Sequence, residues 1–134
     1  MKKTYCLIPF LCLGLFACAP FSEQHRLNQF NETAYAYRRA LLDGNFQAAA
    51  QFINPAVRDA AVDYGPYKNI KVVEYKITHT DVADDKHRIE QDVELTYFLL
   101  NRNIVKSTQT HQRWQFRPMR KVWLLETKLP VFEQ

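Results

Sequence analysis

Glycine is scarce in this chain of 134 residues, which holds only three. Phosphate-binding loops need closely spaced glycines to let the backbone approach the ligand, so a loop of that kind is excluded. Histidine is also sparse, and its residues show neither His-x-x-x-His spacing nor a paired carboxylate at helical spacing. We therefore expect no metal site and no cofactor. The four histidines are His25, His79, His87 and His111.

Catalytic motifs are missing as well. Ser22 and Ser107 lie in no nucleophile elbow. Asp92 and Glu94 alternate with apolar residues of a strand, which predicts that they point to solvent. His111 is out of phase with the apolar positions around it, so spacing brings no acid and base together. We expect no catalytic residue.

Cysteine occurs only near the N-terminus, at Cys6, Cys12 and Cys18. An apolar run over residues 5–16 follows Lys2 and Lys3 and ends in a small residue, Ala17. This order of charged, apolar and small residues is typical of a secretory signal. A membrane-spanning helix needs about 20 apolar residues, and this run is shorter. The run therefore predicts a targeting segment.

The sequence Leu15-Phe16-Ala17-Cys18 resembles the lipobox of bacterial lipoproteins. The resemblance implies a signal peptide over 1–17, a diacylglycerol on Cys18, a lipidated tether over 18–25 and a single domain over 26–134. In these lipoproteins an aspartate directly after the cysteine favours retention at the inner membrane. This chain has Ala19 there, which implies a lipid-anchored protein of the outer membrane that faces the periplasm. Phe16 is bulky for its lipobox position, so a plain secretory signal and a retained anchor stay open as alternatives.

Lipidation would have two consequences for the mature chain. Each buried methylene contributes about 0.8 kcal/mol, so the acyl chains alone would hold the protein at the membrane and no protein patch would be needed. Loss of Lys2 and Lys3 would lower the formal charge from +4 to +2. Because no dense cluster of lysine and arginine follows, we expect no nucleic-acid partner.

The first half of the domain predicts three helices. Apolar residues at steps of three and four mark the first helix, and Asp43-Gly44 ends it. Asn45 is expected to cap a second helix over 46–53, and Asn54-Pro55 to begin a third that stops near Gly65. The apolar residues of the first helix are Leu27, Phe30, Ala34, Tyr37 and Leu41. In the third helix we expect Val57, Ala60 and Ala61 to point inward.

The second half alternates at a period of two, which predicts four strands. The odd positions Val73, Tyr75 and Ile77 are apolar in the first strand. In the second strand the apolar odd positions are Ile89, Val93, Leu95, Tyr97 and Leu99. Turns are expected at 83–86, 101–103 and 117–120, with a last strand over 121–127. Short connections between the strands predict an antiparallel meander, so the fold class is α+β.

This order resembles the nuclear transport factor two-like superfamily, also called the cystatin-like α+β cone. The local sequences that carry the resemblance are YRRALLDGNFQAAAQFI (37–53) followed by NPAVR, QRWQF (112–116) and VWLLETKLPVF (122–132). The resemblance implies three N-terminal helices packed on a curved four-stranded antiparallel sheet around a conical pocket. It also implies the capacity to pair as a homodimer.

Tyr75, Tyr97, Gln112 and Trp114 are the candidate pocket-lining residues, for a small apolar or amphipathic ligand. The alternative is that these side chains fill the interior, because buried aromatics need area and a hydrogen-bond partner. The leading hypothesis is a non-enzymatic ligand-binding or protein-interaction module of the cell envelope. The alternative function is a small-ligand isomerase or hydratase that uses the cone pocket.

Overall fold

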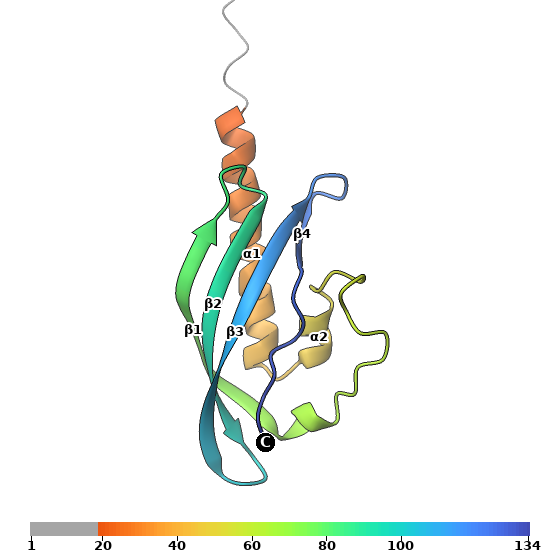
Figure 1. Cartoon of the computed structure of the whole chain (residues 1–134), viewed down its shortest axis with the longest axis vertical. Coiled ribbons are helices and arrows are strands. Elements are labelled where there is room, and N and C mark those ends of the chain that lie inside the picture. Colours follow the sequence, from red (N-terminus) through yellow and green to blue (C-terminus); the bar gives the residue numbers. More distant parts are fainter. Residues whose placement is uncertain (1–18) are drawn as a thin grey trace, which may run out of the picture.

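The computed structural model describes residues 19–134, so the expected signal peptide and Cys18 lie outside the described residues. The described chain forms two α-helices, a short 3-10 helix and one four-stranded antiparallel sheet (Figure 1). The predicted α+β class is confirmed. Within residues 19–134, no helix is long and apolar enough to cross a membrane.

The long helix α1 (Ala19–Leu42) lies along one face of the sheet (Figure 1). Its predicted apolar stripe is confirmed: Phe30, Tyr37 and Leu41 are buried, with Leu27 and Ala34 partly buried beside them. The helix begins at Ala19, so the segment expected to be a tether continues the helix as a straight extension. The domain is therefore joined to the chain before it by helix rather than by extended backbone.

Helix α2 (Phe46–Ala50) begins where the sequence predicts and ends earlier. Gly44 adopts a φ of 72°, the left-handed conformation that glycine reaches without strain, and this reverses the chain after α1. The Asn45 side chain accepts a hydrogen bond from the Ala48 N–H at 3.0 Å, as expected for an N-cap. Phe46, Ala49 and Ala50 are buried.

The expected third helix is wrong. Residues 51–65 form turns and irregular backbone, and the 3-10 helix η1 (Pro66–Asn69) follows. Asn54 closes a single turn, since its carbonyl accepts from Val57 and Arg58. Ala60 and Ala61, expected to point inward, are exposed.

A contact with the sheet holds the segment before the expected third helix. The Asn54 N–H donates to the Leu125 carbonyl and the Leu125 N–H donates to the Phe52 carbonyl, both at 2.8 Å. These bonds pair Ile53 with Leu125 in a parallel bridge. They fix residues 52–54 against the last strand, and the chain after Asn54 forms one turn that is not continued as a helix.

The sheet is a meander in the order β1-β2-β3-β4, as predicted. Its strands are β1 (Ile70–Val82), β2 (Arg88–Leu99), β3 (Ile104–Arg117) and β4 (Val122–Leu125). In β2 every odd position from Ile89 to Leu99 is buried, which confirms the predicted phase. The fourth strand is shorter than the expected 121–127.

The predicted inner face of β1 is only partly correct. Tyr75 is buried, but Val73 and Ile77 are 52% and 46% exposed. The pairing register with β2 shifts between Val72 and Glu74. Such a bulge adds one residue and moves the following side chains to the opposite face. Val72, rather than Val73, therefore packs in the core.

Each hairpin turn holds one non-glycine residue with positive φ. These residues are Lys86 between β1 and β2, Asn103 between β2 and β3, and Lys121 between β3 and β4. The first and third turns lie at the end of the molecule where α1 begins, and the second lies at the opposite end, near the C-terminus (Figure 1). The molecule thus has an α1 end and a distal end.

Candidate functional site

Three of the four candidate pocket residues meet in the interior. Tyr75 from β1 lies with its hydroxyl 3.0 Å from Oε1 and 2.9 Å from Nε2 of Gln112 on β3. The Trp114 indole N–H donates to the same Oε1 at 3.3 Å. Tyr97 lies apart from them, and its hydroxyl donates to the Glu133 carbonyl at 2.9 Å. The sequence thus predicted a set of residues of which three form one hydrogen-bonded network.

Aromatic side chains fill the space around this network. Trp114 has no exposed surface and packs edge-on against the rings of Phe30 and Tyr37, with ring centres 5.9 and 5.5 Å apart. Tyr97 is fully buried, and its ring packs on Phe132 near the C-terminus. The candidate residues therefore lie within a packed core, and Tyr75 alone among them borders a groove described below.

The buried tyrosines are held in their neutral form. Burial raises the pKa of Tyr37, and the nearby Tyr75 and Tyr67 add to the effect. Burial also raises the pKa of Tyr75, although the Gln112 hydrogen bond and Arg38 oppose it. A neutral phenol donates and accepts hydrogen bonds but does not remove a proton at neutral pH. The core network positions side chains and offers no general base.

Ionisable side chains gather instead on the outer face of β2 and β3. His111 Nδ1 lies 2.7 Å from Asp92 Oδ1, and its Nε2 lies 3.4 Å from Glu90 Oε1. Arg113 Nε donates to the same Glu90 oxygen at 2.9 Å. The prediction that Asp92 and His111 lie on a solvated face is confirmed, since both side chains are half exposed. The expectation that no acid and base come together is wrong, because the register of β2 and β3 places Asp92 opposite His111.

This outer network shifts the pKa of two of its members. The hydrogen bond to Asp92 raises the pKa of His111, and Glu90 adds to the rise. Hydrogen bonds from Arg113 and His111 lower the pKa of Glu90. Both shifts arise because these contacts favour the charged forms of His111 and Glu90 at the surface. Over residues 19–134 no group of three histidine, cysteine or carboxylate side chains could hold a metal ion.

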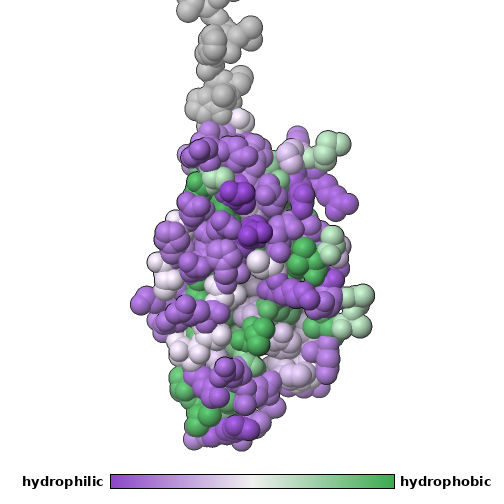
Figure 2. Space-filling view, viewed as in Figure 1, coloured by the Kyte–Doolittle hydropathy of each residue, from purple (hydrophilic) through white to green (hydrophobic). Residues whose placement is uncertain are grey.

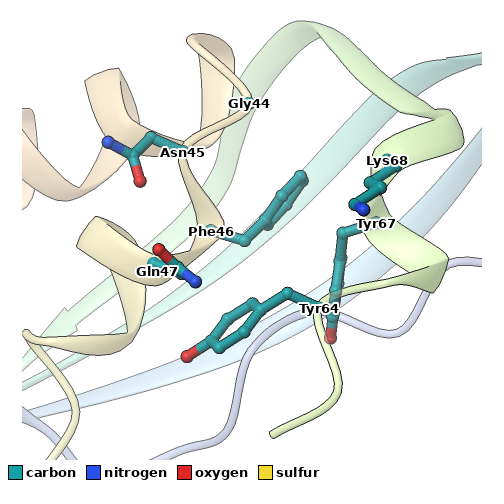
Figure 3. A pocket seen from close by; sticks show the side chains of 7 residues that line it. All are labelled: Gly44, Asn45, Phe46, Gln47, Tyr64, Tyr67 and Lys68. Carbon is teal, nitrogen blue, oxygen red and sulfur yellow. The ribbon is translucent and has the colours of Figure 1, made fainter.

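The surface hollows differ in size. An open hollow of about 670 Å³ lies over the outer face of β2 and β3, and its lining is charged and polar: Arg88, Glu90, Arg113, Gln115, Arg117 and Glu126. Two other hollows are small. A groove of about 160 Å³ runs between α1 and β1, lined by residues that include Tyr35, Arg38, Tyr75 and Gln91. A hollow of about 180 Å³ lies beside α2, where the rings of Phe46, Tyr64 and Tyr67 surround it with Lys68 at its rim (Figure 3). Ligand pockets are usually about 300–1,000 Å³. Neither hollow was predicted from the sequence, because each joins residues from distant segments.

The distal end carries an exposed apolar surface that we call the distal tip, comprising Leu100, Ile104 and Val105 of the β2–β3 hairpin. These residues are 53%, 39% and 61% exposed. Hydrophobic side chains gather at this lower end of the molecule (Figure 2). Arg102 lies within the turn, and Lys71 shares a register row with Val105 across β2. The distal tip is apolar at its centre and basic around it.

No family model, curated protein or solved structure matches this chain.

Proposed function

We propose that this chain is a lipoprotein of the outer membrane, anchored by lipid on Cys18, whose domain faces the periplasm as a non-enzymatic protein-interaction module. The observation that carries the proposal is the filled interior. Trp114 and the residues around it occupy the space where a cone of the nuclear transport factor two-like type would hold a ligand. A packed interior favours function at the surface over function in a pocket.

The distal tip is the surface that best suits such a partner. Exposed Leu100, Ile104 and Val105 are large apolar side chains at one hairpin end, and exposed apolar surface marks interaction sites. Ile104 and Val105 follow one another in β3, so the two faces of the hairpin each carry an apolar side chain. No Asp or Glu occurs between Glu94 and Glu126, so the charged residues nearest the tip along its own hairpin are the cations Arg102 and Lys106. We expect an envelope protein with an apolar centre and an acidic rim.

The length of α1 favours a distal tip that points away from the membrane. A helix of 24 residues spans about 36 Å, and the distal tip lies at the end of the molecule away from its start. If Cys18 is held in the bilayer, the tip would stand well beyond the lipid headgroups. The tip would then meet proteins in the periplasm.

The enzyme alternative, an isomerase or hydratase of the cone type, has less support. Such enzymes need a buried acid or base in an apolar cavity. Among the described residues, the polar side chains in the buried class are the amides Gln91 and Gln112, together with tyrosines. The groove beside Tyr75 and the aromatic hollow beside α2, at about 160 and 180 Å³, are both small for a ligand.

Photo-crosslinking in cells tests the proposal. A benzophenone amino acid at Val105 should give a discrete adduct with another envelope protein. The matched control is Tyr35 on α1, which is equally exposed at 61% and should give none. Equal labelling at both positions, or none at Val105, would contradict the distal tip as the interface. An adduct of twice the protomer mass would show that the tip contacts a second copy of this chain and not another envelope protein.

The anchor is tested separately. Cys18→Ala should release the protein from the membrane fraction, because the acyl chains could no longer be attached. A variant that stays with the membrane as the parent does would show that lipid on Cys18 is not what holds it.

A further inference from the structure

Two hairpin turns that differ in net charge lie at the α1 end of the domain (Figure 1). The β1–β2 turn carries the adjacent carboxylates Asp84 and Asp85, which Lys86 in the same turn and Arg88 just after it offset. The β3–β4 turn over 118–121 carries Arg120 and Lys121 and no carboxylate, and the Met119 side chain in this turn is 97% exposed. One turn therefore has little net charge, and the other presents cations beside a fully exposed apolar side chain.

Both turns are fixed to α1 by hydrogen bonds. Arg26 Nε donates to the Lys86 carbonyl at 3.1 Å, and Gln29 Nε2 donates to the Lys121 carbonyl at 2.6 Å. The Trp123 indole N–H donates to the Arg26 carbonyl at 2.9 Å. The position of each turn is thus set relative to the helix axis, and the two turns cannot reorient independently of the helix.

The cations of the β3–β4 turn are available to an outside partner. Arg117 at its start is paired with Glu126. Within residues 19–134, neither Arg120 nor Lys121 forms a side-chain ion pair or hydrogen bond, and both are exposed. Arg88, which begins β2 on the outer face, is also exposed without an ion pair among these residues.

The start of α1 sets the distance from these turns to a bilayer. Arg26 lies seven positions after Ala19, where the helix begins, so the two are about 10 Å apart along the axis. Electrostatic attraction to a charged surface acts over about 8–10 Å at physiological ionic strength. A lipid on Cys18 would bring both turns close to this range of the headgroups.

We propose that the domain leans onto the bilayer through its β3–β4 turn, a tilt that depends on the lipid anchor proposed above. Met119 enters the headgroup region, and Arg120 and Lys121 contact anionic lipid headgroups. The β1–β2 turn, which has little net charge, gains no such contact. The lipid holds the protein at the membrane, and the turn decides how the domain is oriented there.

Spin labels in the lipidated mature protein test the tilt. Once Cys18 carries lipid, a cysteine introduced at Met119, Asp84 or Val105 is the sole free thiol. The protein is reconstituted into vesicles of phosphatidylethanolamine alone or mixed with phosphatidylglycerol, with a nickel chelate on some headgroups. Relaxation by nickel should be strongest at position 119, weaker at 84 and absent at 105. The difference between 119 and 84 should grow with phosphatidylglycerol and shrink with salt.

Charge reversal supplies the matched variant. Each cation near an anionic surface favours contact about fivefold, so Arg120→Glu with Lys121→Glu should remove the enhancement at position 119 while the protein still floats with the vesicles. Asp84→Asn is the control and should leave position 119 close to the bilayer.

The outcomes separate the two proposals. Equal relaxation at 119 and 84, or no response to phosphatidylglycerol, in a protein that floats with vesicles would overturn the tilt alone. A protein that carries no lipid and does not float would overturn the anchor, and the tilt with it.

Discussion

The two faces of β3 place polar residues side by side under opposite conditions. Gln112 points inward, is almost fully buried and bonds to both Tyr75 and Trp114. His111 and Arg113, its neighbours in sequence, point outward and pair with carboxylates in contact with water. The comparison indicates that burial sets the value of a polar contact. Whether a residue of β3 lies on the buried or the solvated face matters more to the stability of the fold than which polar group it carries.

The largest effect should come from the inner face. Trp114→Ala removes a fully buried ring that packs on Phe30 and Tyr37, and should lower the free energy of unfolding by about 3–5 kcal/mol. Urea unfolding followed by circular dichroism measures it. The outer-face control, Gln109→Ala on the same strand, should change stability by less than about 0.5 kcal/mol. Similar losses for both variants would contradict the comparison.

A smaller effect should distinguish two buried glutamines that face each other in the sheet. Gln112→Leu leaves the Trp114 N–H and the Tyr75 hydroxyl without their partner, and should cost about 1–3 kcal/mol. Gln91 is its cross-strand neighbour, and its buried Oε1 has no partner among the described residues. Gln91→Leu should therefore be neutral or stabilising.

The same unfolding assay compares the two glutamine variants. Adding Tyr75→Phe to Gln112→Leu should recover part of the loss, because the hydroxyl left unpaired is removed. Equal losses for Gln91→Leu and Gln112→Leu would show that side-chain shape at these positions matters more than the hydrogen-bond network.

The smallest effect should come from the outer network. Since the folded pKa of His111 is raised above its usual value of about 6.5, protonated His111 stabilises the fold below that pH, and this contribution is lost as pH rises through the folded pKa. Exposed pairs are screened, so the contribution should stay below about 1 kcal/mol. His111→Gln and Asp92→Asn should each flatten the dependence of unfolding free energy on pH in this range.

An unchanged pH dependence in both outer-face variants would mean that the His111–Asp92 contact contributes nothing to stability. The denaturant slope serves as the control, because neither substitution should alter the surface exposed on unfolding.

The elements that local sequence patterns predict are those that depend on few distant contacts. The α1 stripe, the Asn45 cap and the alternation of β2 are confirmed because each follows from spacing within one segment. The phase of β1 could not be predicted, since Val72 and Val73 are both apolar and only the bulge decides which points inward. Local composition carries no signal for that choice.

The third helix fails although its start is formed. Asn54-Pro55 closes one turn, and local sequence does not distinguish this turn from the start of a helix. The Asn54 N–H bonds to Leu125, about 70 residues later in the chain, which no local pattern indicates.

For the candidate site, the sequence predicted the aromatic and amide residues but not that Gln112 joins Tyr75 to Trp114, while Tyr97 bonds to the C-terminal segment. The hollows and the placement of the charged turns also need the tertiary structure.

Each of the three hairpin turns holds a non-glycine residue in the left-handed backbone conformation, which limits the substitutions that these turns tolerate. Lys86, Asn103 and Lys121 hold a conformation that costs an ordinary residue about 1–2 kcal/mol, and glycine would relieve it. Glycine would also delete a cation or an amide from a protruding turn. The chain keeps strained backbone in the protruding turns at both ends of its long axis. Among residues 19–134 the left-handed glycine is Gly44, at the reversal between the helices.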